Sequence, residues 1–279
     1  MMLEPAPSLP LADGRAIPAI GYGTAALDDD NAPDLVGHAI SVGYRLLDTA
    51  ARYDNEVGVG RGIAASTVNR SDLVVTTKLR GAEHGRDEAR KALEGSLTRL
   101  GLDYVDLYLI HWPLPRVDKY VESWQTMIAM RDEGLVRSIG VSNFLPEHLD
   151  RLERETGVLP VVNQVEMHLE WTQTEQRRYH AQHDIVTESW SPLRRGGRVL
   201  QNPVLGDIAS TLGVTAGQVI LRWHVQSGVV PIPYSGNRDR MASNFDVFSF
   251  ELGDDQMRAL ATLDSADRFG GDPNTHEEF

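Results

Sequence analysis

The stretch DYVDLYLIHWP, residues 103–113, decides the fold, because a run of β-forming residues ends directly in a polar group, His111. Two runs of the same kind lie upstream, one closing on Asp48 and one on Lys78. The spacings, 30 residues from 48 to 78 and 33 from 78 to 111, each match one strand plus one helix. Since the carboxyl ends of parallel strands meet at one edge of a sheet, we expect these side chains to converge there, together with Tyr53 shortly after Asp48.

The same alternation of strand and helix continues along the chain. Strand candidates lie near residues 18–22, 45–48, 73–78, 105–111, 136–142, 161–165, 184–190 and 229–233. Helical patterns between them include 33–43, 87–100, 119–132, 146–155, 174–182 and 215–227, with Asp87 and Thr215 as helix openers and Gly101 as a helix end. Eight alternations predict a single-domain (β/α)8 TIM barrel over residues 1–279.

Two segments lie outside this alternation. Residues 9–20 carry an Asp13-Gly14 turn between apolar stretches, which predicts an N-terminal β-hairpin at the barrel floor. The tail from residue 268 is rich in turn formers and ends in an aromatic residue, so we expect it to fold over one face of the barrel.

The composition limits the classes of function. A net charge of −13 argues against broad nucleic-acid binding, and the absence of cysteine excludes disulfides, thiolate metal sites and a thiol nucleophile. The chain has no basic-apolar leader and no run approaching the roughly 18–20 apolar residues of a membrane helix. We therefore expect a cytoplasmic protein without a membrane partner. No heptad seam or long exposed apolar strand calls for a second copy, which favours a monomer.

The four polar residues together suggest acid-base chemistry. A phenol has a pKa of about 10, which the ammonium of Lys78 would lower, while Asp48 would keep that ammonium charged and positioned. Tyr53 would then be a proton donor, and His111 would orient a substrate carbonyl. Reduction of an aldehyde or ketone needs such a donor together with a hydride from a cofactor. Taken singly, each residue also fits a structural role in a barrel.

Long ordered motifs surround these residues: LDTA at 47–50 with Tyr53, TKL at 77–79, residues 103–113, GVSNF at 140–144 and NQVEMH at 163–168. They resemble the aldo-keto reductase family over essentially the whole chain, and most nearly its bacterial 2,5-diketo-D-gluconate reductase branch. The resemblance implies NADPH-dependent reduction of aldehydes or ketones, with Tyr53 as the acid. NADH is expected to serve at lower efficiency.

The resemblance also implies which residues hold the nicotinamide end of the cofactor. Trp190 would stack on the nicotinamide ring, although a core aromatic at a strand end is the alternative interpretation. Ser142, Asn143 and Gln164 would bind the carboxamide. Thr24 would lie by the nicotinamide ribose, and Leu193 by the pyrophosphate. No Gly-x-Gly-x-x-Gly motif follows a strand, so the sequence does not predict a Rossmann site.

At the adenosine end the chain departs from the family pattern. Tyr234 replaces the lysine expected at the 2′-phosphate, and Ser243 replaces a glutamate near the adenine. The pattern is otherwise kept at Ile232, Ser235, Arg240 and Asn244, and a helix that begins near Asn237 favours phosphate. We expect NADPH to be preferred over NADH by a narrower margin than usual. Three arginines in the loop 194–198 either clasp the cofactor or form a solvated turn.

The substrate site is predicted by analogy to be small and mostly apolar, lined by Tyr22, Leu79, Trp112 and Phe144. The substrate itself stays open among small aldehydes, dicarbonyls, aromatic aldehydes and keto-sugars. Two other interpretations compete with a carbonyl reductase. One is a barrel metallohydrolase built on His111, Glu166, His168 and a carboxylated Lys78, although the sequence has no His-x-His motif. The other is an NADP(H)-binding redox sensor or partner subunit, against which the intact tetrad argues.

Overall fold

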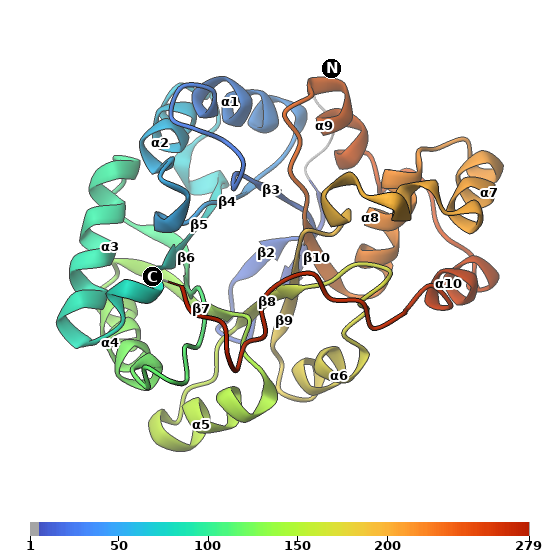
Figure 1. The fold of residues 1–279 in the computed structure, drawn as a ribbon. Coiled ribbons are helices and arrows are strands. Elements are labelled where there is room, and N and C mark those ends of the chain that lie inside the picture. The colour runs from blue at the N-terminus through green and yellow to red at the C-terminus, as the bar shows by residue number, and fades with distance from the viewer. Residues whose placement is uncertain (1–5, 279) are drawn as a thin grey trace.

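The computed structural model describes residues 6–278 and contains an eight-stranded parallel barrel with helices around it (Figure 1). Neighbouring strands follow in chain order from β3 to β10, and the barrel closes where the Gly23 N–H donates to the Pro233 carbonyl at 3.0 Å. The strands are β3 (Gly21–Gly23), β4 (Leu46–Asp48), β5 (Val74–Leu79), β6 (Val105–Ile110), β7 (Val136–Ser142), β8 (Val162–Glu166), β9 (Val186–Trp190) and β10 (Val229–Ile232). The predicted (β/α)8 barrel is confirmed.

The helices cover the outside of the strands. They are α1 (Ala32–Val42), α2 (Glu56–Ala64), α3 (Arg86–Leu100), α4 (Tyr120–Asp132), α5 (Pro146–Thr156), α6 (Thr174–Gln182), α7 (Pro203–Leu212), α8 (Ala216–Gln226), α9 (Arg238–Phe245) and α10 (Asp254–Ala261). Thr215 caps α8 through the N–H of Gln218, and Gly101 ends α3 at φ +65°, both as predicted. Asp87 does not open α3: Gly85 is the N-cap, and Asp87 lies in the first turn, where its charge still suits the helix dipole.

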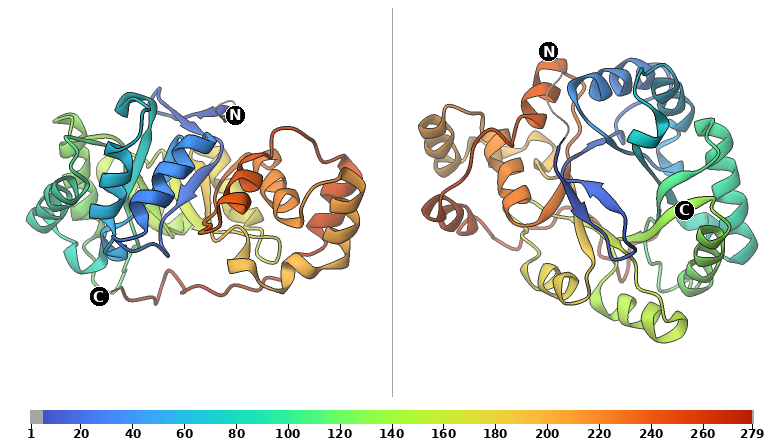
Figure 2. Two further views of the ribbon diagram at one scale, coloured as in Figure 1. Left: turned by 90° about the horizontal axis from the view of Figure 1, so that it is seen from above. Right: turned by 180° about the vertical axis from the view of Figure 1, so that it is seen from behind.

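The N-terminal hairpin lies at the floor of the barrel. Strands β1 (Ser8–Pro10) and β2 (Ala16–Pro18) pair antiparallel, and Gly14 supplies the left-handed turn at φ +84°. Figure 2 places this hairpin and the C-terminal tail at opposite ends of the barrel. The hairpin takes residues up to Pro18, so the first barrel strand covers 21–23 rather than the expected 18–22.

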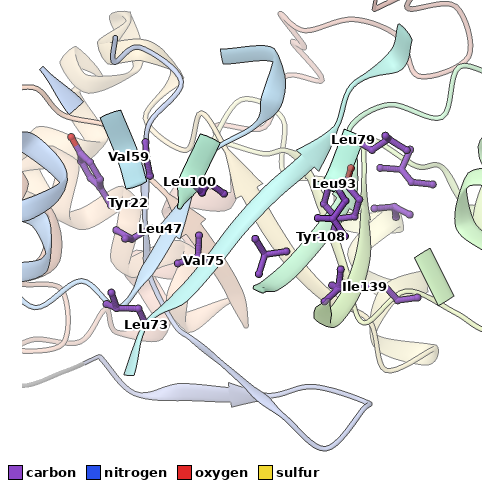
Figure 3. Packing of buried hydrophobic residues seen from close by; sticks show 14 of the residues in the cluster. Tyr22, Leu47, Val59, Leu73, Val75, Leu79, Leu93, Leu100, Tyr108 and Ile139 are labelled. Carbon is purple, nitrogen blue, oxygen red and sulfur yellow. The ribbon is translucent and has the colours of Figure 1, made fainter. Parts of the chain in front are cut away.

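Alternation along the strands divides the core into two layers. One set of side chains fills the barrel interior, where Leu46, Leu109 and Ile232 meet Ile17 of the hairpin. The other set points outward against the helices, as Leu47, Val75 and Leu79 do (Figure 3). A residue next to an inward-facing catalytic group therefore points away from the site.

No single helix in residues 6–278 is long and apolar enough to cross a membrane. One bent pair, α7 with α8, would pass on length and composition alone.

Candidate active site

The tetrad of Asp48, Tyr53, Lys78 and His111 assembles at the carboxyl end of the barrel. Asp48 is the last residue of β4, Lys78 lies one residue before the end of β5, and His111 directly follows β6. Tyr53 ends the short 3₁₀ helix η1 (Ala51–Tyr53), and the next residue, Asp54, adopts a left-handed φ of +53°. The convergence predicted from the spacing of the motifs thus appears in the structure.

Lys78 is the hub of the tetrad. Its fully buried ammonium lies 2.6 Å from Oδ1 of Asp48 and donates to the Tyr53 hydroxyl at 3.2 Å. Its third hydrogen bond goes to the Thr49 carbonyl at 3.1 Å, so all three ammonium protons have acceptors. The ammonium also lies 4.9 Å from the centre of the Tyr53 ring.

The pKa shifts of Lys78 and Tyr53 differ in one respect from those predicted from the sequence. Burial alone would lower the pKa of Lys78, but Asp48 and Tyr53 outweigh it and raise the pKa, so the ammonium stays charged. Burial raises the pKa of Tyr53, and Lys78 offsets this only in part. The expected net lowering of the Tyr53 pKa is therefore wrong. The phenol is held neutral, as a proton donor must be before it reacts.

Two carboxyl groups share the side chain of Gln164, on β8. Its Nε2 donates to Oδ2 of Asp48 and to Oε2 of Glu188, both at 2.9 Å. Within residues 6–278 no hydrogen bond reaches the Gln164 Oε1, which leaves this carbonyl oxygen free for an amide donor. Burial, followed by the nearby charge of Asp48, raises the pKa of Glu188 to about 8. Glu188 is a site residue that the sequence motifs did not predict, although it stands two residues before Trp190.

The side of the site predicted to hold the nicotinamide is built on strained backbone. Asn143 follows β7 at φ +63°, and Ser191 follows Trp190 at φ +51°. The indole N–H of Trp190 donates to Oδ1 of Asn143 at 2.8 Å, while Ser142 donates through Oγ to the Gln164 carbonyl. These contacts fix a half-buried aromatic ring beside amide and hydroxyl groups, which suits a flat ring bearing a carboxamide.

The other residues predicted for the cofactor lie along the same face. Thr24 is buried and donates through Oγ1 to the Asp48 carbonyl, while Leu193 is half-buried. The side chain of Ile232 is buried in the inner core, which leaves only its backbone to contact a cofactor.

At the adenosine end, Tyr234 is exposed and Ser235 is buried. Asn237 caps α9 by accepting from the Arg240 N–H, as expected for a helix beginning there. Arg240 makes no ion pair among the described residues, whereas Arg238 pairs with Asp34 at 2.6 Å. The exposed hydroxyl of Ser243 bonds the Arg240 carbonyl, and Asn244 is buried. A free guanidinium beside a capped helix start fits a phosphate group.

The arginine loop has partners within the protein. Arg194 pairs with Glu170 and, at 2.6 Å, with Asp267 at the start of the tail. The guanidinium of Arg195 lies 5.6 Å from the ring centre of Phe269, and Arg198 is largely exposed. Arg194 therefore binds groups within the protein and holds the tail.

Three of the four predicted substrate-site residues lie in the outer core instead. Tyr22 donates its hydroxyl to the Ser235 carbonyl and packs on Tyr44, Leu79 packs under the helices, and Phe144 packs on Tyr120. Tyr22 and Leu79 lie on strands next to inward-facing positions, so the strand alternation turns them outward. Phe144 lies beyond the end of β7, after the left-handed Asn143, and its backbone is bonded to Asn163. Trp112 does lie at the barrel mouth, where its ring is 3.9 Å from that of His276.

The tail is the part of the site that the sequence motifs did not reveal. It crosses the catalytic end of the barrel, as its turn-rich composition predicted (Figure 1). The N–H groups of Phe269 and Gly270 donate to the Glu166 carboxylate at 2.9 and 2.8 Å. Further on, Oε1 of Glu278 lies 2.7 Å from Nδ1 of His111, out of line for a well-directed hydrogen bond.

The geometry does not support the metallohydrolase interpretation. Glu166 and His168 contact each other at 3.0 Å, and Lys78 is held by Asp48. Among residues 6–278, no three histidine or carboxylate side chains cluster as metal ligands.

Comparisons with known proteins agree with this geometry. The model of the Aldo/keto reductase family matches residues 19–265. The chain is 50% identical to 2,5-diketo-D-gluconic acid reductase B of Corynebacterium sp. (strain SHS752001) over 273 residues, which cover 98% of this chain and 99% of the relative. It is 46% identical to methylglyoxal reductase DkgA of Escherichia coli (strain K12) over 265 residues, covering 95% and 96%. Among solved structures, a mutant of Gox0644 in complex with NADPH superposes with a TM-score of 0.94 at 42% identity, covering 98% of this chain and 99% of that one.

Proposed function

This chain belongs to the aldo/keto reductase family and is an NADPH-dependent carbonyl reductase, and we propose that its tetrad carries out the proton transfer. The observation that carries the proposal is the buried ammonium of Lys78, which bridges Asp48 and the Tyr53 hydroxyl. A sensor or partner subunit would have no need for such a pair.

In this proposal Tyr53 is the general acid. Bound NADPH supplies the hydride to the carbonyl carbon. As negative charge develops on the substrate oxygen, the Tyr53 hydroxyl gives it a proton. The resulting phenolate is stabilised by the Lys78 ammonium 3.2 Å away, and Asp48 holds that ammonium in place. His111 orients the carbonyl beside the donor, since its ring lies 5.9 Å from that of Tyr53.

The residues proposed for the cofactor follow the same face of the barrel. Gln164 would accept a hydrogen bond from the carboxamide through its free Oε1, next to Ser142 and Asn143, and Trp190 would stack on the ring. At the far end, Arg240 and the start of α9 would hold the 2′-phosphate. The exposed Tyr234 contributes a hydroxyl in place of a cation, so we propose a narrow preference for NADPH over NADH.

We further propose that the chain works as one domain and as a cytoplasmic monomer that binds a small carbonyl compound and neither nucleic acid nor membrane. The absence of cysteine and the net charge of −13 support this proposal. Light scattering of the purified protein would test its oligomeric state.

The first experiment is NADPH consumption with small aldehydes, dicarbonyls and quinones, comparing wild type with Tyr53→Phe. We expect the variant to lose at least a hundredfold in kcat, the lower range for a general acid, while NADPH binding measured by fluorescence stays intact. Running the assay with NADH gives the cofactor preference. Full activity of Tyr53→Phe would refute the assignment of the acid, and tight binding without turnover in wild type would favour the sensor.

A further inference from the structure

A carboxylate from the tail is built into the substrate end of the site. Glu278 is 7% exposed, and its Oε1 lies 2.7 Å from Nδ1 of His111. Its Oε2 accepts the N–H of Gly81 at 3.0 Å, in the loop after β5. The two oxygens therefore face Gly81 in the loop after β5 and His111 directly after β6.

Several contacts fix this part of the tail. The backbone of Glu278 packs so closely on Gly81 that a Cβ there would lie 2.2 Å from the Glu278 carbonyl oxygen. Two residues earlier, the ring of His276 packs against that of Trp112, with the ring centres 3.9 Å apart and the planes tilted by 35°. The exposed Glu277 between them points to Arg116 at 3.3 Å. The position of Glu278 is thus fixed by packing on Gly81 and by the neighbouring contact of His276 with Trp112.

The charge of Glu278 is not cancelled by the neighbouring imidazoles of His84 and His276. Burial would raise the pKa of Glu278, but the contact with His111 outweighs it and holds the pKa below its usual value. Burial lowers the pKa of His84 to about 4 and also lowers that of His276, so both are neutral at pH 7. Arg52, whose charge also lowers the pKa of Glu278, is exposed to solvent, which screens that charge.

We propose that Glu278 is a specificity-determining residue, which makes this reductase select neutral and cationic carbonyl substrates over anionic ones. An anionic substrate would need donors such as the Gly81 N–H, which Glu278 already occupies, and Oε1 of Glu278 lies 2.7 Å from Nδ1 of His111, where a second anion would have to approach. Its own charge also repels a second carboxylate in a site shielded from water. This inference rests on the proposed function, because it assumes that the carbonyl binds beside His111.

The test compares Glu278→Gln with wild type on three benzaldehydes of similar size: 4-carboxy, 4-nitro and 4-trimethylammonio. Glutamine keeps an acceptor for the Gly81 N–H, so the tail stays seated while the charge is removed. We expect the kcat/KM ratio of the carboxy to the nitro compound to rise at least tenfold, and that of the trimethylammonio to the nitro compound to fall. The matched control is Glu277→Gln, which removes the same charge from an exposed neighbour and should change either ratio less than twofold.

A binding measurement separates this inference from the proposed function. Benzoate and benzamide are titrated while tryptophan fluorescence is followed, since Trp112 lies against the tail. Benzoate should bind Glu278→Gln at least tenfold more tightly than wild type, and benzamide equally. Unchanged benzoate affinity, or equal effects of Glu277→Gln, would overturn the role of Glu278. Absence of turnover in wild type would instead overturn the proposed function, and the binding result would still decide on Glu278.

Discussion

At the scale of single residues, the mouth of the barrel holds two buried carboxyl groups close to one ammonium. Asp48 has Lys78 as its partner, whereas Glu188 has only the amide of Gln164, and its Oε1 has no partner among the described residues. The two groups therefore have different roles: Asp48 binds and positions the Lys78 ammonium, while the raised pKa of Glu188 keeps that carboxyl protonated at neutral pH. One shared amide thus connects the acid side of the site with the face proposed for the nicotinamide.

Glu188 predicts a dependence of stability on pH. Its folded pKa of about 8 lies above the ordinary value of 4.5, so between these values the unfolded chain loses a proton that the folded chain keeps. Stability should then fall as pH rises through this window and level off above pH 8. Glu188→Gln removes this slope, so its stability relative to wild type should increase by on the order of 2 kcal/mol from pH 5 to pH 7.

Urea unfolding at several pH values checks this prediction. Glu277→Gln is the control, because its exposed carboxyl should leave the slope unchanged. Parallel stability curves for wild type and Glu188→Gln would show that Glu188 is ionised in the folded protein.

At the scale of secondary structure, what could be predicted followed from periodicity. The strands ending in Asp48, Lys78 and His111 were predictable because each combines β-forming residues with a polar end. Three of the four pocket residues could not be predicted from their closeness to strand ends: the in-out alternation buries Tyr22 and Leu79, and the left-handed turn at Asn143 precedes the buried Phe144. The helical patterns named from the sequence do not include α2, in which Gly58, Gly60 and Gly62 dilute the helical pattern.

Those glycines have a packing role that Gly60 makes testable. A Cβ at Gly60 would lie 2.2 Å from the Leu100 carbonyl oxygen at the end of α3, so α2 and α3 can approach only without it. Gly60→Ala should lower the free energy of unfolding by about 1–3 kcal/mol, despite the better helix propensity of alanine. Gly206→Ala in α7, where a Cβ meets nothing within 4 Å, should stabilise by up to about 1 kcal/mol. Thermal unfolding of both variants tests this prediction. Equal changes in stability for Gly60→Ala and Gly206→Ala would contradict a packing role for Gly60.

At the scale of the whole molecule, the barrel carries a hairpin at one end and the tail at the other (Figure 2). The hairpin fills the inner core with Ile17 and leaves the floor closed. The tail instead lies over the catalytic end, where it makes polar contacts to Glu166 at the end of β8 and to Arg194 in the loop after β9. Such contacts open more readily than packed core, so the tail is the part suited to admit a substrate.

Arg194 is the tether on which this arrangement depends. It joins Glu170 after β8 to Asp267 of the tail, and the Asp267 N–H donates to the Glu170 carbonyl at 3.0 Å. Arg194→Ala should therefore raise amide hydrogen exchange in residues 265–278 at least tenfold while the barrel strands stay protected. The control is Arg198→Ala, because Arg198 is 80% exposed and 4.0 Å from Asp267, and it should leave exchange unchanged. NADPH affinity measured on the same proteins separates the tether from a cofactor clasp: a loss of affinity without a change in exchange would mean that Arg194 holds the cofactor instead of the tail.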